Sequence, residues 1–477
     1  MYRVLWALGI SVLVLLLAGF VVLASAGGEN GMRFYKSEYV FLVRQAIWLA
    51  VSLPLMYVAI RFDYHKWSKL PWLTIAAYLV VLVLLVAVLI YGRETKGSRR
   101  WLGCGMIRLQ PSELAKLVVV IATSVYLDCK GRQLKKFVKG ALGAALIVGL
   151  PVALVLKEPD FGATFVIGAA GVSLFLLAKD MRLVHIGLFV CAGALLFGTL
   201  LALNPNRMNR ISSWVRSSFQ TSDIPEVEVE KSAADSVAEL KRIADSPQPA
   251  VAAVATRART AMKAVRDVQD YKKGRAMEEG IEAVLKGVAM RLQAEPPSFA
   301  ALRNDLRKQI RSRDRAKAAA HQLDNSLVAI KRGGLTGVGF YESKQKRKFL
   351  PEAHTDFIFA IGAEEWGLGF SLGLLFAFTV VFTCGMIISA RAPDPLGRML
   401  AYGMSLLVCS QALINLWVVT GCAPTKGIAL PFISYGGTNL LTAMIAVGFL
   451  FNVGRQIGLQ TPRPKSRISA VFPSKGV

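Results

Sequence analysis

Ten long, mostly apolar stretches run through this chain and constrain its fold more than any other feature of the sequence. A helix of about 20 apolar residues crosses a bilayer core of about 30 Å. Hydrophobic residues make up 54% of the chain and charged residues only 18%, so these stretches are predicted to be membrane spans rather than the core of a soluble protein. The sequence therefore predicts an all-α integral membrane protein with about ten transmembrane helices. The predicted spans are 4–26, 40–60, 72–91, 112–128, 139–156, 162–178, 183–203, 357–389, 399–420 and 431–452.

Lysine and arginine are unevenly divided between the loops that join these spans. They are concentrated in 61–69, 130–139, 179–182, 391–398 and the C-terminal tail. Cytoplasmic loops carry such an excess, so this face is predicted to be cytoplasmic. The first stretch is predicted to be a retained span rather than a removed signal, because an early cleavage site is lacking. Both termini are then expected in the cytoplasm.

The overall charge and the cysteines predict no further class of partner. Lys and Arg outnumber Asp and Glu by 57 to 31, and membrane topology explains much of this excess, so nucleic acid is not predicted as a partner. The six cysteines are scattered singly, without metal-ligand spacing. They are interpreted as small apolar residues.

Residues 221–318 differ in composition from the rest of the chain. They are rich in Ala, Arg, Lys and Glu, and their apolar residues recur every three or four positions, as in Val237, Leu240 and Ala244. This spacing predicts a small extracytoplasmic bundle of three or four helices, serving as a docking or spacer module. The predicted organisation is spans 1–7 in 1–220, the inserted bundle in 221–318, and spans 8–10 after re-entry in 319–477.

Two polar clusters flank the start of the fourth predicted span. Arg99, Arg100 and Trp101 precede it, and Glu113 and Lys116 lie three residues apart on one helix face inside it. A buried acid and base at this depth usually line a cavity. Two alternatives remain open: the acid and base only fix helix packing, and the preceding arginines only touch lipid headgroups.

A third cluster stands before the eighth span. Residues 344–348 concentrate cations, and His354 and Asp356 follow at the mouth of the span. An acid beside bases at the membrane boundary is suited to taking a proton from a substrate hydroxyl. Asp356 could instead cap the eighth helix, and His354 could be an interfacial polar residue. Residues 157–162 are interpreted as a tight turn between the fifth and sixth spans.

A fourth cluster lies before and within the tenth span. It comprises Pro424–Gly427, with Lys426, and Pro431–Thr438, with Ser434 and two adjacent glycines that allow close backbone approach. Cations around an outer-face cavity suit an anionic substrate, and the membrane setting suits one carried on a lipid. The residues alone predict no more than this class.

These motifs, taken in order, resemble the SEDS family of bacterial cell-wall synthesis. The matching segments are Arg99–Trp101 with Gln110–Lys116, Pro159–Gly162, Leu350–Ala360, and Pro424–Gly427 with Pro431–Gly437. The resemblance covers roughly 1–220 and 319–477, and the segment 221–318 has no counterpart in it. The Glu-Ala-His and Pro-Thr-Lys-Gly forms are closer to the division members, FtsW, than to the elongation members, RodA.

The resemblance implies a peptidoglycan glycosyltransferase of the bacterial inner membrane that polymerises lipid II, with its active site on the extracytoplasmic face. It implies a class B penicillin-binding protein and other divisome proteins as partners. It also implies Asp356 as the catalytic residue, which assists deprotonation of the acceptor hydroxyl while undecaprenyl pyrophosphate leaves. The substrate-binding residues implied by matching positions or by charge are Trp101, Arg99, Arg100, Glu113, Lys116, Lys344, His354, Lys426 and Ser434.

Two other functions fit the same residues. A lipid II flippase would also use basic and intramembrane charged residues, and a non-catalytic scaffold would only recruit the transpeptidase. A divalent cation, Mg²⁺ or Mn²⁺, could share in binding pyrophosphate, but the sequence shows no dedicated set of metal ligands.

Overall fold

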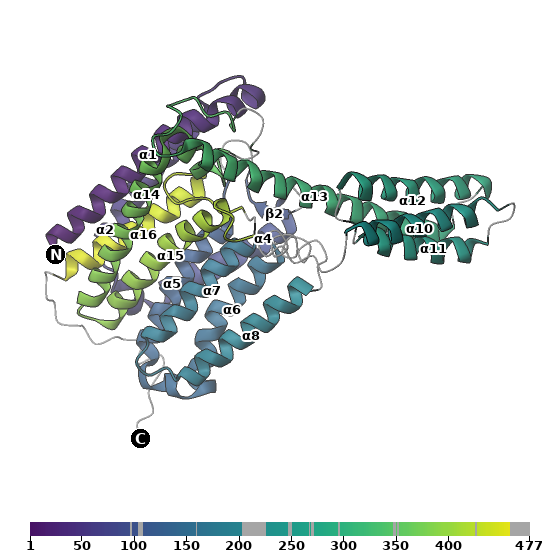
Figure 1. Ribbon diagram of the computed structural model, residues 1–477. Coiled ribbons are helices and arrows are strands. Elements are labelled where there is room, and N and C mark those ends of the chain that lie inside the picture. The colour runs from purple at the N-terminus through teal and green to yellow at the C-terminus, as the bar shows by residue number, and fades with distance from the viewer. Residues whose placement is uncertain are drawn as a thin grey trace. The chain divides into compact units, whose positions relative to one another are not determined.

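The structure is a computed structural model in which the chain divides into two compact units (Figure 1). Met1–Phe197 and Asp324–Val477 form the first, called the membrane unit here, and Gly198–Leu323 form the second, called the inserted unit. The residues that the structure describes are 1–95, 98–103, 108–158, 160–202, 226–246, 250–266, 268, 271–293, 296–346, 350, 353–424 and 427–457.

A helix lies at each of the ten predicted spans. In chain order these helices are α1 (Tyr2–Tyr35), α2 (Val40–Arg61), α4 (Pro71–Tyr91), α5 (Pro111–Lys130), α6 (Leu142–Lys157), α7 (Phe161–Leu177), α8 (Leu183–Ala202), α14 (Ile358–Arg391), α15 (Pro395–Val419) and α16 (Gly437–Gln456). Short elements connect some of them: α3 (Lys66–Lys69), the strands β1 (Arg93–Thr95) and β2 (Ser98–Trp101), a 3-10 turn at Gly131–Lys135 and a π turn at Phe137–Ala141.

Most of these helices meet the requirements for crossing a membrane. Within the described ranges, α1, α2, α4, α6 with the preceding π turn, α14, α15 and α16 are long and apolar enough to span it, and α7 and α8 are shorter apolar helices. Helix α5 carries Glu113, Lys116 and Asp128 and is mostly buried among other helices. The prediction of an all-α membrane fold is confirmed, and the antiparallel pair β1–β2 is a small addition to it.

The end of α1 and the start of α16 differ most from the predicted spans, because α1 continues to Tyr35 although its span was predicted to end at residue 26. The tenth span was predicted from residue 431, but α16 begins at Gly437. The residues before it form turns in which Phe432, 1% exposed, has φ 66°, a conformation that a bulky residue rarely adopts. Helix α14 is interrupted at Gly367, where φ is 69°. Amides of Val338 and Gly339 donate to the carbonyls of Glu364 and Glu365 there, so the backbone groups released by the break are satisfied.

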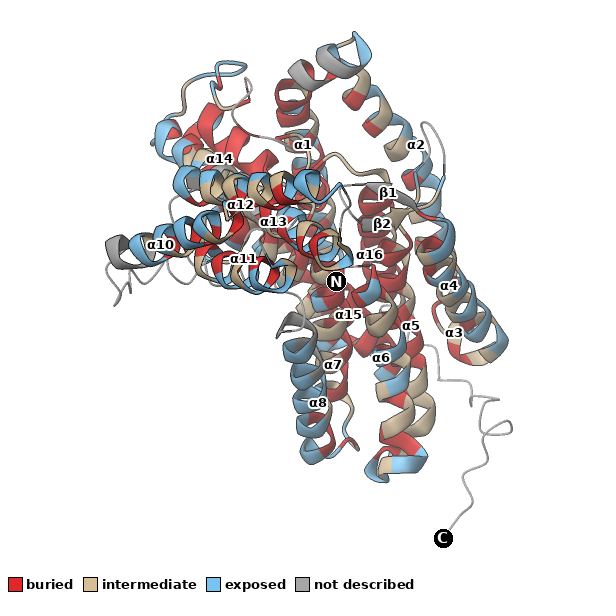
Figure 2. Cartoon of the chain, turned by 90° about the vertical axis from the view of Figure 1, so that its right-hand side faces the viewer, coloured by how far each residue is buried: buried red, intermediate tan, exposed pale blue. Residues whose placement is uncertain are grey.

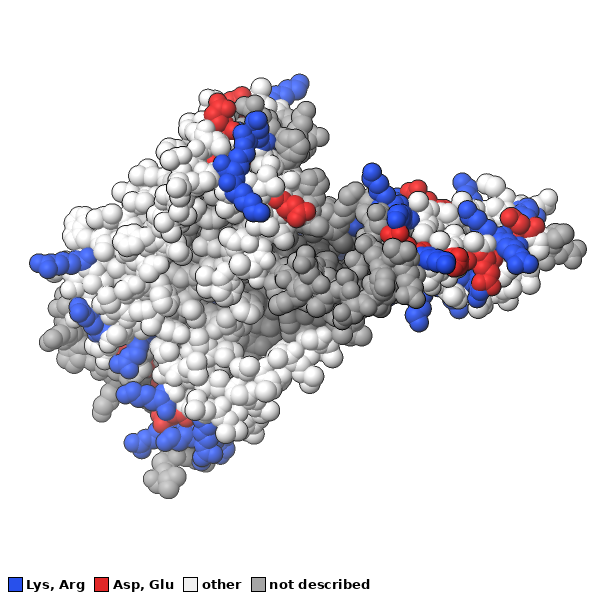
Figure 3. Space-filling model, in the orientation of Figure 1, with Lys and Arg blue, Asp and Glu red and all other residues white. Residues whose placement is uncertain are grey.

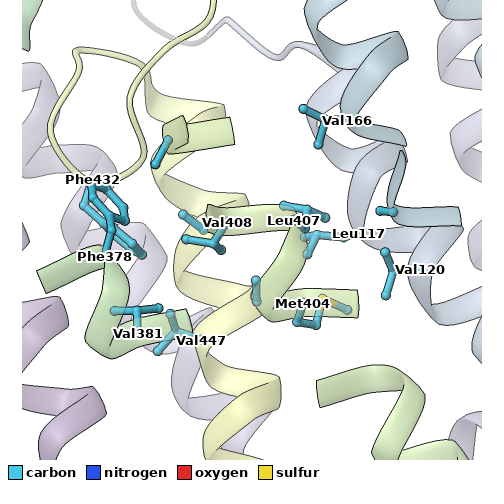
Figure 4. Close-up of a cluster of buried hydrophobic side chains, with 14 of the residues drawn as sticks. Leu117, Val120, Val166, Phe378, Val381, Met404, Leu407, Val408, Phe432 and Val447 are labelled. Carbon is cyan, nitrogen blue, oxygen red and sulfur yellow. The ribbon is translucent and has the colours of Figure 1, made fainter. Parts of the chain in front are cut away.

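The core of the membrane unit lies where α5, α7, α14, α15 and α16 meet. Figure 4 shows Leu117 of α5, Val166 of α7, Val381 of α14, Leu407 of α15 and Val447 of α16 converging there, and all are buried. Figure 2 shows α5 and α16 largely buried, whereas α4 and α8 carry many exposed residues. Exposed apolar residues on outer helices are suited to contact with lipid.

A cluster of polar side chains joins two connections of the membrane unit, the one between α2 and α4 and the one between α14 and α15. The His65 imidazole lies 2.8 Å from Asp63 and 3.5 Å from Asp394, and the Tyr64 hydroxyl donates to Asp394 at 2.6 Å. Asp394 also caps α15 by accepting from the amide of Gly397. Burial lowers the pKa of His65, but the hydrogen bonds to Asp394 and Asp63 outweigh it and raise this pKa above its usual value.

We expect His65 to make the stability of the membrane unit dependent on pH. Because the folded state binds the imidazole proton more tightly, the stabilisation is fully present below a pH of about 6.5 and is lost as the pH rises through the raised pKa. Relative to His65→Gln, the wild type should lose unfolding free energy as the pH rises from about 6 to about 9. Thermal unfolding of both proteins across this range measures the difference. Parallel pH profiles would contradict the assignment.

The inserted unit contains a bundle of helices with its own core. It comprises α10 (Glu226–Ala244), α11 (Val251–Arg266), α12 (Tyr271–Arg291) and the part of α13 (Pro297–Gly333) before residue 324. Leu240, Val254, Leu285 and Phe299 are fully buried in it. The apolar positions that predicted these helices are buried except Leu292, which is 38% exposed at the end of α12.

Candidate functional site

Asp356 lies in the loop that precedes α14. The N-cap of this helix is Phe357, so the alternative that Asp356 is itself the N-cap of the eighth helix is wrong. Its backbone carbonyl accepts a hydrogen bond of 2.8 Å from the side-chain amide of Asn415. A Cβ on Gly427 would stand 2.6 Å from Asp356 Oδ2, so the carboxylate lies directly against this glycine. The lack of a side chain at Gly427 gives the carboxylate its room.

The loop before α16 holds the residues next to Asp356. The Ser434 hydroxyl donates to the Thr355 carbonyl at 2.6 Å and accepts from the Leu430 amide at 2.8 Å. The Tyr435 amide donates to the His354 carbonyl at 3.0 Å, and the His354 ring packs on Phe41 at 4.3 Å. Ser434 and His354 thus support the loop that carries Asp356.

A buried polar network on α15 connects Asp356 to the Glu113–Lys116 pair. Lys116 Nζ lies 2.6 Å from Glu113 Oε2 and 2.5 Å from Gln411 Oε1, and both charged residues are buried. Gln411 stands four residues before Asn415, so the two amides share one face of α15. The pair therefore contributes to a network that reaches the Asp356 loop as well as to helix packing.

Sequence reasoning missed the amides Gln411, Asn415 and Asn439. Gln411 Nε2 donates to Asn439 Oδ1 of α16 at 2.7 Å, and the hydroxyl of Thr442 donates to Glu113 at 3.3 Å. Two amide side chains four positions apart in an apolar span would have been a usable signal, because polar residues inside a membrane span usually face other polar groups.

Asp160 links the turn between α6 and α7 to the same region. Its carboxylate caps α7 by accepting from the Ala163 amide at 3.2 Å, and it accepts from Gln110 Nε2 at 2.9 Å. A Cβ on Gly162 would lie 2.5 Å from the side chain of Ile428, which follows Gly427. This turn therefore packs directly against the segment that contacts Asp356.

The predicted arginines and Trp101 lie on β2. Trp101 pairs with Arg93 of β1. The Arg100 Nε donates to the carbonyl of Glu158 at 3.2 Å, whereas the exposed Arg99 donates to the Ile90 carbonyl at 3.4 Å. Arg100 is thus tied to the turn that carries Asp160.

Glu158 is a further residue of this turn that sequence reasoning did not single out. Its side chain is 1% exposed, and neither carboxylate oxygen has a hydrogen-bond partner among the described residues. Burial, and then the nearby charge of Asp160, raise the pKa of Glu158 to about 8, against a smaller opposing effect of Arg100. Glu158 is therefore held largely protonated at neutral pH.

We expect Glu158→Gln to flatten the pH dependence of stability between about pH 4.5 and about pH 8. The unfolded state ionises near pH 4.5 and the folded state near pH 8, so raising the pH between these values favours unfolding. Across this window the unfolding free energy of the wild type should fall by a few kcal/mol more than that of Glu158→Gln. The upper bound is about 1.4 kcal/mol for each pKa unit. Thermal unfolding at pH 5 and pH 8.5 measures this, and equal losses in both proteins would refute the raised pKa.

Two adjacent glutamates fix the cation-rich loop before Asp356. Glu364 accepts from Arg332 at 2.9 Å and from the backbone amide of Lys344 at 3.1 Å. Glu365 pairs with the buried Lys346 at 2.9 Å. The Lys344 side chain is exposed, so this lysine remains accessible to a ligand.

The predicted site residues fall into connected groups. Asp356, His354 and Ser434 share one loop network, which Asn415 and Gln411 extend to Glu113 and Lys116. Arg100 contacts the Glu158 turn, and Lys344 contacts Glu364. Lys426 lies outside the described residues. In the described part of the chain, no three His, Cys, Asp or Glu side chains come together as metal ligands.

Comparison with known proteins places this arrangement in a family. Residues 6–223 and 305–458 match the model of the FtsW, RodA and SpoVE proteins, described as cell cycle proteins. The chain belongs to this family. Its resemblance to the SEDS proteins is confirmed, and the match omits 224–304, within the predicted insertion.

Individual relatives of this SEDS chain are similar along most of its length. It is 30% identical to a probable peptidoglycan glycosyltransferase FtsW of Coxiella burnetii, over 93% of this chain and 94% of that protein. It is 28% identical to stage V sporulation protein E of Bacillus subtilis, over 93% of this chain and 94% of that protein. These names agree with the predicted likeness to FtsW rather than to RodA.

Solved structures share the fold of this SEDS chain. One comes from a study of how a peptidoglycan synthase complex coordinates polymerization and crosslinking. Its TM-score to this chain is 0.59 at 22% identity, and the match covers 95% of this chain and 98% of the other. The crystal structure of Thermus thermophilus rod shape determining protein RodA gives 0.52 at 21% identity, over 94% and 96%. The chain is a multi-pass membrane protein of this fold.

Proposed function

We propose that this chain is a peptidoglycan glycosyltransferase that polymerises lipid II into glycan strands during septal wall synthesis. The observation that carries the proposal is the placement of Asp356. Its carboxylate lies against Gly427, while the side-chain amide of Asn415 holds its backbone. The names of the sequence relatives support the same reaction.

The proposed reaction uses Asp356 as the proton acceptor. As the acceptor's sugar hydroxyl attacks the anomeric carbon of the donor, its proton passes to Asp356, a new glycosidic C–O bond forms, and the bond to pyrophosphate breaks. Undecaprenyl pyrophosphate leaves with the bonding electron pair. A loop fixed by Ser434 and Asn415 limits movement of the carboxylate before attack.

Three cationic side chains are proposed to stabilise the leaving group. Arg100, Lys344 and Lys426 are the candidates for the pyrophosphate, and Arg99 and Trp101 for neighbouring parts of the substrate. Glu113 and Lys116 are proposed to keep the site in shape through Gln411. Mg²⁺ or Mn²⁺ is a further proposal, and without three protein ligands among the described residues it would take most of its ligands from pyrophosphate and water.

The proposed setting is the bacterial inner membrane, with both termini in the cytoplasm and the site on the outer face. The bias of Lys and Arg towards 61–69, 130–139 and 179–182 supports this orientation. A class B penicillin-binding protein is the proposed partner that crosslinks the strands, together with other divisome proteins. One structural neighbour comes from a peptidoglycan synthase complex that coordinates polymerization and crosslinking, and this supports that choice.

Three assays on the same purified protein separate this function from its alternatives. The chain, with its class B partner in nanodiscs, is given labelled lipid II and penicillin, and glycan strands are resolved by gel electrophoresis. We expect polymer. In liposomes, translocation of labelled lipid II without polymer would support the flippase, and failure of both assays with intact binding of the partner would support the scaffold.

A further inference from the structure

An apolar cavity lies away from the Asp356 loop, between α4, α5 and α6. Its volume is about 180 Å³. Ile75 and Tyr78 of α4, Ala122, Val125 and Tyr126 of α5, and Ile147 of α6 form its walls. These residues take no part in the network around Asp356, so the cavity calls for a separate explanation.

The two tyrosines of the cavity wall use their hydroxyls elsewhere. Tyr78 donates to the carbonyl of Ile147 at 3.1 Å, and Tyr126 donates to the carbonyl of Gly140 at 3.0 Å. Their rings and the aliphatic side chains therefore line the space. A cavity without polar partners is a poor site for water and is suited to hydrocarbon.

The cavity borders on surfaces that face the bilayer. Ile75 is 52% exposed and Leu146, beside Ile147, is 60% exposed. Both lie on helices that are apolar enough to cross the membrane. Lipid chains are therefore the hydrocarbon with direct access to this space.

One end of the cavity is cationic. Lys130 lines it, and the connection after α5 adds Arg132, Lys135, Lys136 and Lys139. Helix α3, with Lys66 and Lys69, packs on α5 through Ser68, whose hydroxyl lies 3.8 Å from Cys129 Sγ of the cavity. Asp180 pairs with Lys135, and Asp128 precedes Cys129, so these cations outnumber the nearby acids. Figure 3 shows Lys and Arg gathered at the ends of the membrane unit, beyond its uncharged surface.

We propose that this cavity binds one acyl chain of an anionic phospholipid, with the phosphate of the headgroup at Lys130. The apolar walls select the hydrocarbon chain, and the cationic end selects the charge of the headgroup. A ligand that binds the folded state alone raises its stability, so occupancy can be read from unfolding. This site is independent of the proposed glycosyltransferase reaction.

The test compares two lipids with the same acyl chains. The full-length protein in neutral detergent is titrated with phosphatidylglycerol or phosphatidylcholine, and the unfolding temperature is recorded. Native mass spectrometry counts the lipids that remain bound. We expect a larger increase in unfolding temperature with phosphatidylglycerol and one retained molecule of it. Equal increases with the two lipids would overturn the proposal.

Variants separate the acyl-chain site from binding at the surface. Ala122→Phe fills the cavity with a larger side chain. Ile75→Trp fills it from the partly exposed wall and is used if Ala122→Phe fails to fold. Lys130→Gln removes the charge, and Lys179→Gln removes a cation from another connection of the same face as the matched control. We expect both cavity-filling variants and Lys130→Gln to lose the preference for phosphatidylglycerol. Lys179→Gln should keep it. Loss in Lys130→Gln with full retention in both filled variants would overturn the acyl-chain site.

Discussion

Asp356→Asn is expected to reduce glycan polymerisation by at least about 100-fold, the usual minimum for loss of a general base. The amide cannot accept the proton of the attacking hydroxyl. The fold should be retained, because the hydrogen bond from Asn415 goes to the backbone carbonyl of residue 356, which the substitution keeps. Asparagine is also close in size to aspartate, so the contact with Gly427 can persist. The measurement is polymer formed from labelled lipid II, with penicillin present to prevent crosslinking.

Asp180→Asn is the matched control for this prediction. It removes a carboxylate outside the site, where Asp180 pairs with the 56% exposed Lys135 at 3.3 Å. We expect nearly full polymerisation from it. The unfolding temperature of both variants checks their fold. Polymer from Asp356→Asn within a few-fold of wild type would remove Asp356 from the mechanism while leaving other parts of the proposed function to be judged separately.

Lys116→Met is expected to give the largest loss of stability. It leaves the carboxylate of Glu113, a residue that is 7% exposed, without its cation in the interior of the membrane unit. Removing one partner of a buried ion pair costs about 3–5 kcal/mol. Thr442 still donates to Glu113 at 3.3 Å, but one hydrogen bond does not replace the ion pair. Thermal unfolding in a neutral detergent measures the loss.

A second variant shows whether the uncompensated charge causes this loss. Glu113→Gln combined with Lys116→Met leaves no unpaired charge and should recover most of the lost stability. Lys135→Met breaks the exposed pair with Asp180 and should cost less than about 1 kcal/mol. If the double variant unfolds as easily as Lys116→Met alone, packing of the lysine side chain, rather than its charge, is responsible.

The membrane helices were predictable because their signal is local. Each span is a continuous apolar run, and a bilayer requires a helix to satisfy the backbone of such a run. The helices of the inserted unit were predictable from apolar spacing of three or four residues, as in Val254, Ala258 and Met262. The predicted start of the tenth span was wrong because Pro431 and Phe432 are apolar but lie in turns before α16.

Most of the candidate site was predicted as residues but not as an arrangement. The clusters around Arg100, Glu113 and Asp356 stood out as polar groups beside apolar runs, and the family resemblance gave Asp356 its proposed role. Their connections did not stand out. Gln411 and Asn415 were hidden in an apolar span, and Glu158 was one of several charged residues in a short turn.

Local patterns in the sequence were enough to predict the membrane class, the position of the spans and the candidate residues for the chemistry. The contact of Asn415 with the loop of Asp356, 59 positions away, and the room that Gly427 leaves for the carboxylate became visible in the folded chain. Hydropathy and helical spacing act over neighbouring residues. Hydrogen bonds and steric fit instead depend on which distant segments the packed helices bring together.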